Sequence, residues 1–122
     1  MNQPLLSSNI LIVEDNAILA CDLENVVCDS GGQSVGPAYT LEAGLKLAES
    51  EQISAALLDI NLGDDLVWPL ARNLRDNGIP FSFLSAACGR KDLPDDLREA
   101  VCMDKPATQQ DIIRTLQFLL DN

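Results

Sequence analysis

Short apolar runs alternate along the chain with longer amphipathic stretches. The runs that predict strands cover residues 10–13, 34–38, 55–59, 80–85 and 101–103. Apolar residues at helical spacing predict helices over 17–30, 41–51 and 67–77, and a last helix, capped by Thr108, that buries Ile112, Leu116, Leu119 and Leu120. Strands that alternate with helices in this way are typical of an α/β fold with a parallel sheet.

Two stretches fit this pattern less well. Pro37 lies inside the weak second strand, and because proline cannot donate a hydrogen bond to a neighbouring strand, we expect that strand at a sheet edge. Between residues 86 and 99 the apolar pattern is poor, and Leu93-Pro94 leaves room for no more than a short helix.

The composition is that of one ordinary folded domain. The chain has 122 residues, of which 47% are hydrophobic, and no apolar run is long enough to span a membrane. Residues 1–4 carry no basic stretch ahead of an apolar one, so we expect no signal peptide and a cytoplasmic protein. Lys and Arg number 8 and Asp and Glu 19, a net charge of −11 that disfavours binding to nucleic acids and to anionic membranes.

The four cysteines are Cys21, Cys28, Cys88 and Cys102. They show no CxxC spacing, and the chain contains no histidine, so the usual zinc ligand sets are missing. In a cytosolic protein we expect these cysteines to be buried, reduced thiols. The lack of histidine also means that any phosphohistidine donor must be a separate protein.

Polar residues follow the ends of four apolar runs. Glu14 and Asp15 follow the first, Asp59 closes the third, Ser85 closes the fourth, and Lys105 comes shortly after the fifth. Because the carboxyl ends of parallel strands meet at one edge of a sheet, we expect these groups to converge. Carboxylate oxygens suit Mg²⁺. Each residue alone is as well explained as part of a loop, with an aspartate capping the first helix; their common position at strand ends carries the prediction.

This arrangement, with Lys105-Pro106 after the last strand, resembles the CheY-like receiver domain of bacterial two-component response regulators. The resemblance implies that Asp59 accepts a phosphoryl group as an acyl phosphate, while Ser85, the backbone N–H of Ala86 and Lys105 bind that group. It implies a cis bond before Pro106. It also implies that Mg²⁺ binds to Glu14, Asp15, Asp59 and the backbone carbonyl of Asn61.

A receiver domain implies a flavodoxin-like fold, a doubly wound five-stranded parallel sheet in the order 2-1-3-4-5. We expect residues 1–122 to form this one domain, with a core over about 9–120 and no output domain. The chain would be a phosphoacceptor that assists its own phosphorylation and dephosphorylation in a phosphorelay, and not an enzyme. Its donor would be a sensor histidine kinase or a histidine phosphotransfer protein. The sequence leaves the protein target and the oligomeric state, a homodimer included, open.

One position departs from the family pattern. Many receivers carry an aromatic residue three positions before the lysine, and here Cys102 occupies that position. We therefore predict that structural change on phosphorylation concentrates in residues 86–97. The stretch 81–86, together with Gly89 and Leu93-Pro94, resembles an atypical alphaproteobacterial group of stand-alone receivers with a degenerate fourth helix.

Two other function classes stay open. The missing aromatic residue is compatible with a receiver-like interaction module that does not use phosphorylation. A hydrolase with an aspartyl nucleophile is the third class, but Asn61 stands where such enzymes carry a second aspartate. Labelling with a small-molecule phosphodonor, with and without Mg²⁺, separates the three.

Overall fold

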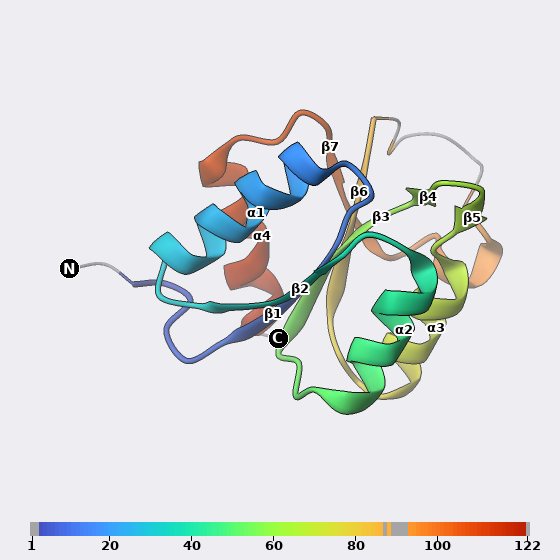
Figure 1. Cartoon of the computed structure of the whole chain (residues 1–122), viewed down its shortest axis with the longest axis horizontal. Helices are drawn as coiled ribbons and strands as arrows, with labels where there is room; N and C mark the ends of the chain where they lie inside the picture. The colour runs from blue at the N-terminus through green and yellow to red at the C-terminus, as the bar shows by residue number, and fades with distance from the viewer. Residues whose placement is uncertain (1–2, 87, 89–92, 122) are drawn as a thin grey trace.

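The computed structural model describes residues 3–86, 88 and 93–121 (Figure 1). Its main sheet has five parallel strands in the order β2-β1-β3-β6-β7, which confirms the predicted doubly wound fold. The edge position of β2 agrees with the prediction from Pro37. The strands are β1 (Asn9–Val13), β2 (Gln33–Ala38), β3 (Ala55–Asp59), β6 (Phe81–Ser85) and β7 (Val101–Asp104).

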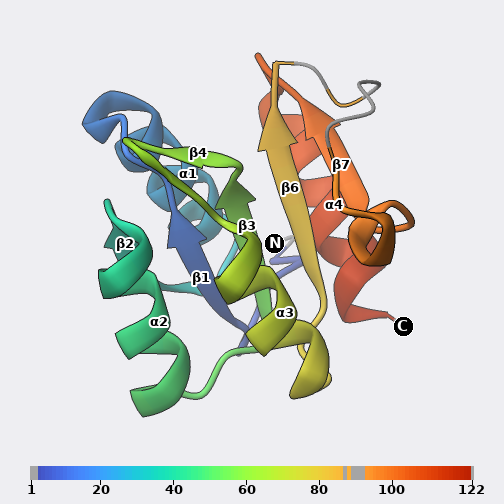
Figure 2. The same ribbon diagram turned by 90° about the vertical axis from the view of Figure 1, so that its right-hand side faces the viewer.

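Helices cover both faces of this sheet (Figure 2). The helices α1 (Ala17–Asp29) and α4 (Gln109–Leu120) pack on one face, and α2 (Leu41–Ser50) and α3 (Trp68–Asp76) pack on the other. Alternate residues of β1 serve the two faces, since Ile10 and Ile12 belong to the core under α1 and α4. In the described part of the chain, no helix is both long and apolar enough to cross a bilayer.

The helix caps agree with the sequence. The Thr40 hydroxyl accepts a hydrogen bond from the backbone N–H of Ala43 at 3.1 Å, at the start of α2. Thr108 and Asp111 form a reciprocal capping box at the start of α4, as their spacing predicted. These caps fix where the loops from the strand ends turn into helices.

The connection between β6 and β7 contains only a short 3-10 helix, η1 (Asp95–Leu97), in the part that the structure describes. Residues 87 and 89–92 of the segment predicted to change on phosphorylation lie outside the described residues. Asp96 in η1 binds two arginines of α3, with 3.0 Å from Arg72 Nε and 2.7 Å from Arg75 Nη1 to Asp96 Oδ2. This short connection is thus tied to α3 by charge.

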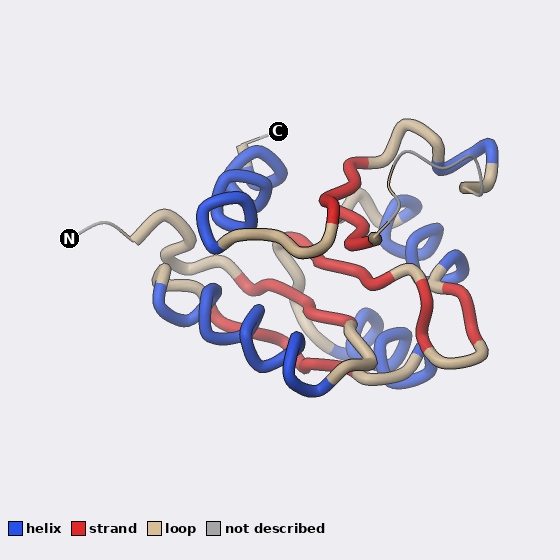
Figure 3. Tube along the Cα trace, turned by 90° about the horizontal axis from the view of Figure 1, so that it is seen from above, coloured by secondary structure: helices blue, strands red, loops and turns tan. Residues whose placement is uncertain are grey.

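A small antiparallel hairpin follows β3 and was not predicted. It consists of β4 (Asn61–Leu62) and β5 (Asp65–Leu66), with Gly63 at a positive φ of 65° in its turn. Figure 3 shows it as two short red strands beyond the end of the main sheet. Strands of this length are too short to give an alternating pattern, which is why the sequence did not indicate them.

The expectation of buried, reduced cysteines was wrong about the burial of Cys21 and Cys28 and about the redox state of Cys88 and Cys102. Cys21 and Cys28 are exposed thiols, and Cys88 and Cys102 form a disulfide with their Cα atoms 5.7 Å apart. The exposed pair lies on the outer side of α1, whose buried residues are Ala20, Leu23 and Val27. Cys102 is half-buried on the edge strand β7, where the chain that leaves β6 can reach it.

Candidate functional site

Three carboxylates meet at the carboxyl ends of β1 and β3. These two strands pair in parallel, with Val13 opposite Leu58, so Glu14 and Asp15 follow β1 beside the end of β3, where Asp59 lies. One side-chain oxygen from each of the three carboxylates lies within 4.8 Å of the others. Glu14 and Asp59 are buried, with 1% and 6% of their surface exposed, whereas Asp15 is exposed.

Lys105 joins this cluster from the end of β7. Its Nζ lies 2.9 Å from Glu14 Oε1 and 3.3 Å from Asp59 Oδ1, and a quarter of its side chain is exposed. The contact with Glu14 is an ion pair without regular hydrogen-bond geometry, since Glu14 Oε1 accepts no hydrogen bond in the described part of the chain. The peptide bond to Pro106 is cis, as the resemblance implied.

Backbone groups orient the two acidic residues after β1. Glu14 Oε2 accepts a hydrogen bond from the Asn16 N–H at 3.1 Å, and Asp15 Oδ2 accepts one from the Gly63 N–H at 3.1 Å. Asn16, and not Asp15, caps α1, because its side-chain oxygen accepts from two backbone N–H groups of the first turn. The explanation of Asp15 as a helix cap is therefore excluded, and its carboxylate is directed by the β4–β5 hairpin instead.

The close packing of these charges alters their ionisation. Burial, followed by the neighbouring Glu14 carboxyl, raises the pKa of Asp59 to about 7, although Lys105 acts in the opposite direction. Burial alone would lower the pKa of Lys105, but Glu14 and Asp59 outweigh it and raise that pKa. Burial alone would raise the pKa of Asp15, but the hydrogen bond from Gly63 and the two neighbouring carboxyls lower it overall.

The donor set fits a hard divalent cation. Three carboxylates face one ammonium group, so the cluster carries excess negative charge, and each carboxylate offers an oxygen. Mg²⁺ prefers oxygen ligands and retains several waters, which a partly exposed cluster of this kind permits. Asn61, whose carbonyl the resemblance adds to the ligands, opens β4 two residues after Asp59.

The predicted phosphoryl-binding residues of β6 lie beside β7. Ser85 is the half-buried last residue of β6, its carbonyl accepts a hydrogen bond from the Lys105 N–H at 2.9 Å, and Ala86 is exposed in the turn that follows. Sequence reasoning missed that this turn continues to Cys88 and a disulfide with Cys102. The two cysteines lie three residues after Ser85 and three before Lys105, but this spacing does not show how the chain turns after β6.

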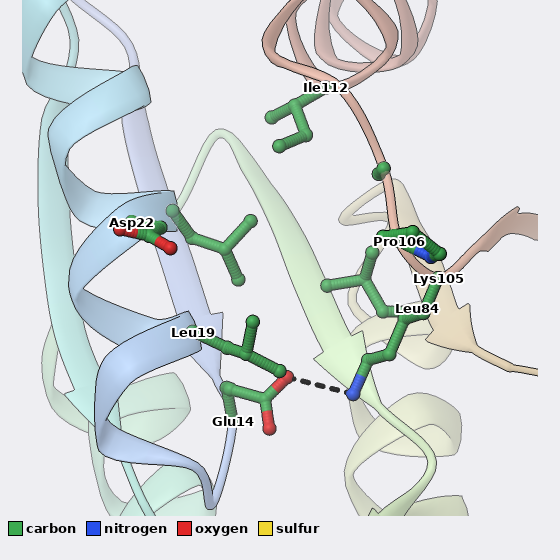
Figure 4. Close-up of a pocket in the computed structure, with 9 residues that line it drawn as sticks. Glu14, Leu19, Asp22, Leu84, Lys105, Pro106 and Ile112 are labelled. Atoms are coloured by element: carbon green, nitrogen blue, oxygen red, sulfur yellow. Dashed lines mark ion pairs between the residues drawn. The ribbon is translucent and has the colours of Figure 1, made fainter.

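A pocket of about 360 Å³ opens beside the cluster, between α1 and the start of α4 (Figure 4). Glu14 and Lys105, two residues of the site, also line this pocket, and Figure 4 shows the ion pair between them. Its apolar wall comes from α1, β6, the loop after β7 and α4, and consists of Leu19, Leu23, Leu84, Pro106, Ala107 and Ile112. The pocket shares Glu14 with the acidic cluster, whereas Asp15 and Asp59 do not line it.

Comparison with known proteins gives matches among solved structures. No protein-family model and no curated protein matches the chain. The response regulator PhyR from Brucella abortus is 29% identical with a TM-score of 0.78, over 96% of this chain and 49% of the PhyR chain. The receiver domain of PhyR from Erythrobacter litoralis is 24% identical with a TM-score of 0.83, over 95% of this chain and 92% of that domain.

A third similar structure contains a metal. It is the receiver domain of the sensor histidine kinase PA1611 from Pseudomonas aeruginosa, with magnesium in its active-site cleft; it is 21% identical, with a TM-score of 0.82, over 95% of this chain and 99% of that chain. The present chain spans about half the length of the Brucella PhyR chain. It has the receiver fold of response regulators over nearly all of its length, and two of the similar structures are PhyR proteins.

Proposed function

We propose that this chain is a response regulator receiver that accepts a phosphoryl group on Asp59 in a phosphorelay. The observation that carries the proposal is the position of Lys105, whose ammonium group contacts both Glu14 and Asp59 although the three residues come from different strand ends. An ammonium group held beside a buried carboxylate is what a phosphoryl acceptor needs, because the transferred group brings additional negative charge.

The residues of the site have distinct tasks in this reaction. An Asp59 carboxylate oxygen attacks the phosphorus of a phosphohistidine, the phosphorus–nitrogen bond breaks, and the imidazole leaves. Lys105 stabilises the charge on the phosphoryl oxygens, and the Ser85 hydroxyl and Ala86 N–H donate hydrogen bonds to them. Mg²⁺, held by Glu14, Asp15, Asp59 and the Asn61 carbonyl, would neutralise further charge when bound.

The partners follow from the chemistry. Since the chain has no histidine, its donor is a sensor histidine kinase or a histidine phosphotransfer protein in the cytoplasm. The phosphorylated domain acts by contact with a protein target, as a monomer or homodimer. It is a phosphoacceptor that assists its own phosphorylation and dephosphorylation, and not an enzyme.

Intact-mass measurement tests the proposal. Incubation with acetyl phosphate and Mg²⁺ should add one phosphoryl group, and a chelator should prevent the addition. Asp59→Asn should remain unlabelled because an amide is not a competent nucleophile. Asp64→Asn, at an exposed position of the β4–β5 turn, is the matched control and should label normally. Labelling of Asp59→Asn would refute the assignment of the acceptor.

The alternative is an interaction module that no longer uses phosphorylation. It is favoured by Cys102, which replaces the aromatic residue of many receivers and is bonded to Cys88. A folded protein that remains unlabelled with acetyl phosphate and Mg²⁺ would support this alternative.

A further inference from the structure

The disulfide between Cys88 and Cys102 joins the two chain segments that supply the proposed phosphoryl-binding groups of β6 and β7. Cys88 follows Ser85 by three residues, and Cys102 precedes Lys105 by three residues. The bond therefore connects the turn that leaves one functional strand end to the strand that leads to the other. Neither the metal site nor the phosphoacceptor requires such a bond.

The disulfide directs the turn after Ser85 back along β7. In the register of the two strands, Cys102 lies opposite Phe83, so the chain has reversed its direction by the time it reaches Cys88. The Cys88 N–H also donates a hydrogen bond to Asp104 Oδ1 at 3.3 Å. The turn is thus attached to β7 twice, once covalently and once by a hydrogen bond.

This attachment holds the turn on the side of β6 away from Asp59. In the sheet, β6 separates β3, which ends at Asp59, from β7. A phosphoryl group on Asp59 would need the Ser85 hydroxyl and the Ala86 N–H to approach from the β3 side. Breaking the disulfide would leave the turn with the weaker attachment to Asp104 and allow this approach.

From this geometry we propose that Cys88 and Cys102 are a thiol–disulfide modification site through which a dithiol reductant promotes phosphorylation of Asp59. The inference rests on the function proposed above. Both cysteines are partly exposed, so a small or protein dithiol can reach the bond. In the cytoplasm proposed for this chain, thiols are kept reduced and disulfides are mostly transient or redox-sensing, which fits a bond that forms and breaks in use.

The exchange is an ordinary two-electron reaction. A thiolate of the reductant attacks one cysteine sulfur, the S–S bond breaks, and the other sulfur leaves as a thiolate. The second thiol of the reductant then attacks the reductant's own sulfur in the mixed disulfide, and the remaining cysteine leaves as a thiolate. The protein gains two electrons and two protons, and the dithiol becomes a disulfide. In the reverse direction, glutathione disulfide takes two electrons and two protons from the cysteines and is released as two glutathione thiols.

The test uses the full chain carrying Cys21→Ser and Cys28→Ser, because these exposed thiols would otherwise react with glutathione. After treatment with glutathione disulfide and then iodoacetamide, mass measurement should find no alkylated cysteine. After treatment with dithiothreitol it should find both Cys88 and Cys102 alkylated. Alkylation of both cysteines after glutathione disulfide would show that the bond does not form and would overturn the proposal.

The functional readout is the initial rate of phosphorylation by acetyl phosphate with Mg²⁺. We expect the reduced form to be labelled at least about five-fold faster than the oxidised form, as loss of part of a hydrogen-bond donor set would produce. The pair Cys88→Ser and Cys102→Ser in the same background should be labelled at the faster rate under both conditions, because no thiol is left to react with glutathione. The fold of this variant is checked by circular dichroism.

The outcomes separate this proposal from the one on which it rests. Equal labelling rates in the oxidised and reduced forms would refute control by the disulfide and leave Asp59 as the acceptor. Faster labelling of the oxidised form would also refute it, since the bond would then preorganise the site. A lack of labelling in both forms would refute the phosphoacceptor function and the redox control together.

Discussion

Glu14 follows β1 and Asp59 ends β3, two strands inside the sheet, whereas Ser85 ends β6 and Lys105 follows the edge strand β7. Every residue of β3 is buried, but in β7 only Met103 is. The carboxylates are therefore fixed by core packing on both faces of the sheet. Lys105 follows a strand with one strand neighbour, and the turn after Ser85 is attached to that edge strand by the disulfide.

This difference indicates a division of labour within the site. A cluster of like charges needs a rigid frame, because any relaxation would let the carboxylates move apart. Hydrogen-bond donors that must approach a newly added group need a region of lower local stability. The receiver fold provides both by placing the acceptor on an interior strand and the donors nearer its edge.

The largest expected effect is on the free energy of unfolding, and it tests the difference in packing between β3 and β7. Leu57→Ala in β3 removes a fully buried side chain and should lower the free energy of unfolding by about 3 to 4 kcal/mol. Val101→Ala in β7, at a half-buried position, should cost only about 1 kcal/mol. Urea denaturation of both variants in the oxidised state measures the difference. Similar losses would mean that β3 and β7 are equally well packed.

The next prediction concerns Lys105, whose side chain extends from the end of β7 to the carboxylates at the ends of β1 and β3. Lys105→Met removes the ammonium group that contacts Glu14 and Asp59, and phosphorylation by acetyl phosphate should slow about 100-fold. Arg98→Met removes an exposed cation paired with Asp95 and should leave the rate unchanged. A rate for Lys105→Met close to that of the parent protein would show that the ammonium group does not act on the phosphoryl group.

A smaller effect sharpens the account of the carboxylate cluster. The pKa of Asp59 is about 7 in the folded, metal-free protein and 3.8 in a model compound. Between these values the unfolded chain has lost the proton and the folded protein has kept it, so this contribution to stability falls as the pH rises from about 4 to about 7. Asp59→Asn removes the dependence and should stabilise the metal-free protein by about 1 to 2 kcal/mol at pH 8 relative to the parent.

Thermal unfolding of both proteins in a chelator, at pH 4 and pH 8, measures this difference. The gain of the variant should be much smaller at the lower pH, where the folded aspartate is protonated and the unfolded one is about half protonated. An equal gain at both pH values would indicate a change in packing and not in ionisation.

The smallest effect concerns the charges that tie η1 to α3. Asp96→Asn removes the partner of Arg72 and Arg75, but all three side chains are exposed, so global stability should change little. Hydrogen exchange at residues 95–97 should become faster, and high salt should produce the same change in the parent protein. Unchanged exchange would show that the buried Leu97 side chain suffices to hold this segment.

The sequence predicts the interior of this molecule better than its edge. The buried runs of β1 and β3 are short, continuous and apolar, and a parallel sheet then determines where Glu14, Asp15 and Asp59 lie. The β4–β5 hairpin was missed because two-residue strands have no periodicity. The Cys88–Cys102 bond was missed because it depends on how the chain turns after Ser85, which no local pattern specifies.

Because the hairpin contacts Asp15, one backbone amide can report on the state of the site. The Gly63 N–H donates to Asp15 Oδ2, yet Gly63 is 48 residues away in sequence and carries no side chain of its own. Its proton resonance therefore depends on the charge of that oxygen. In an NMR titration with Mg²⁺, the Gly63 signal would report occupancy of the carboxylate cluster, without a label attached to any ligand.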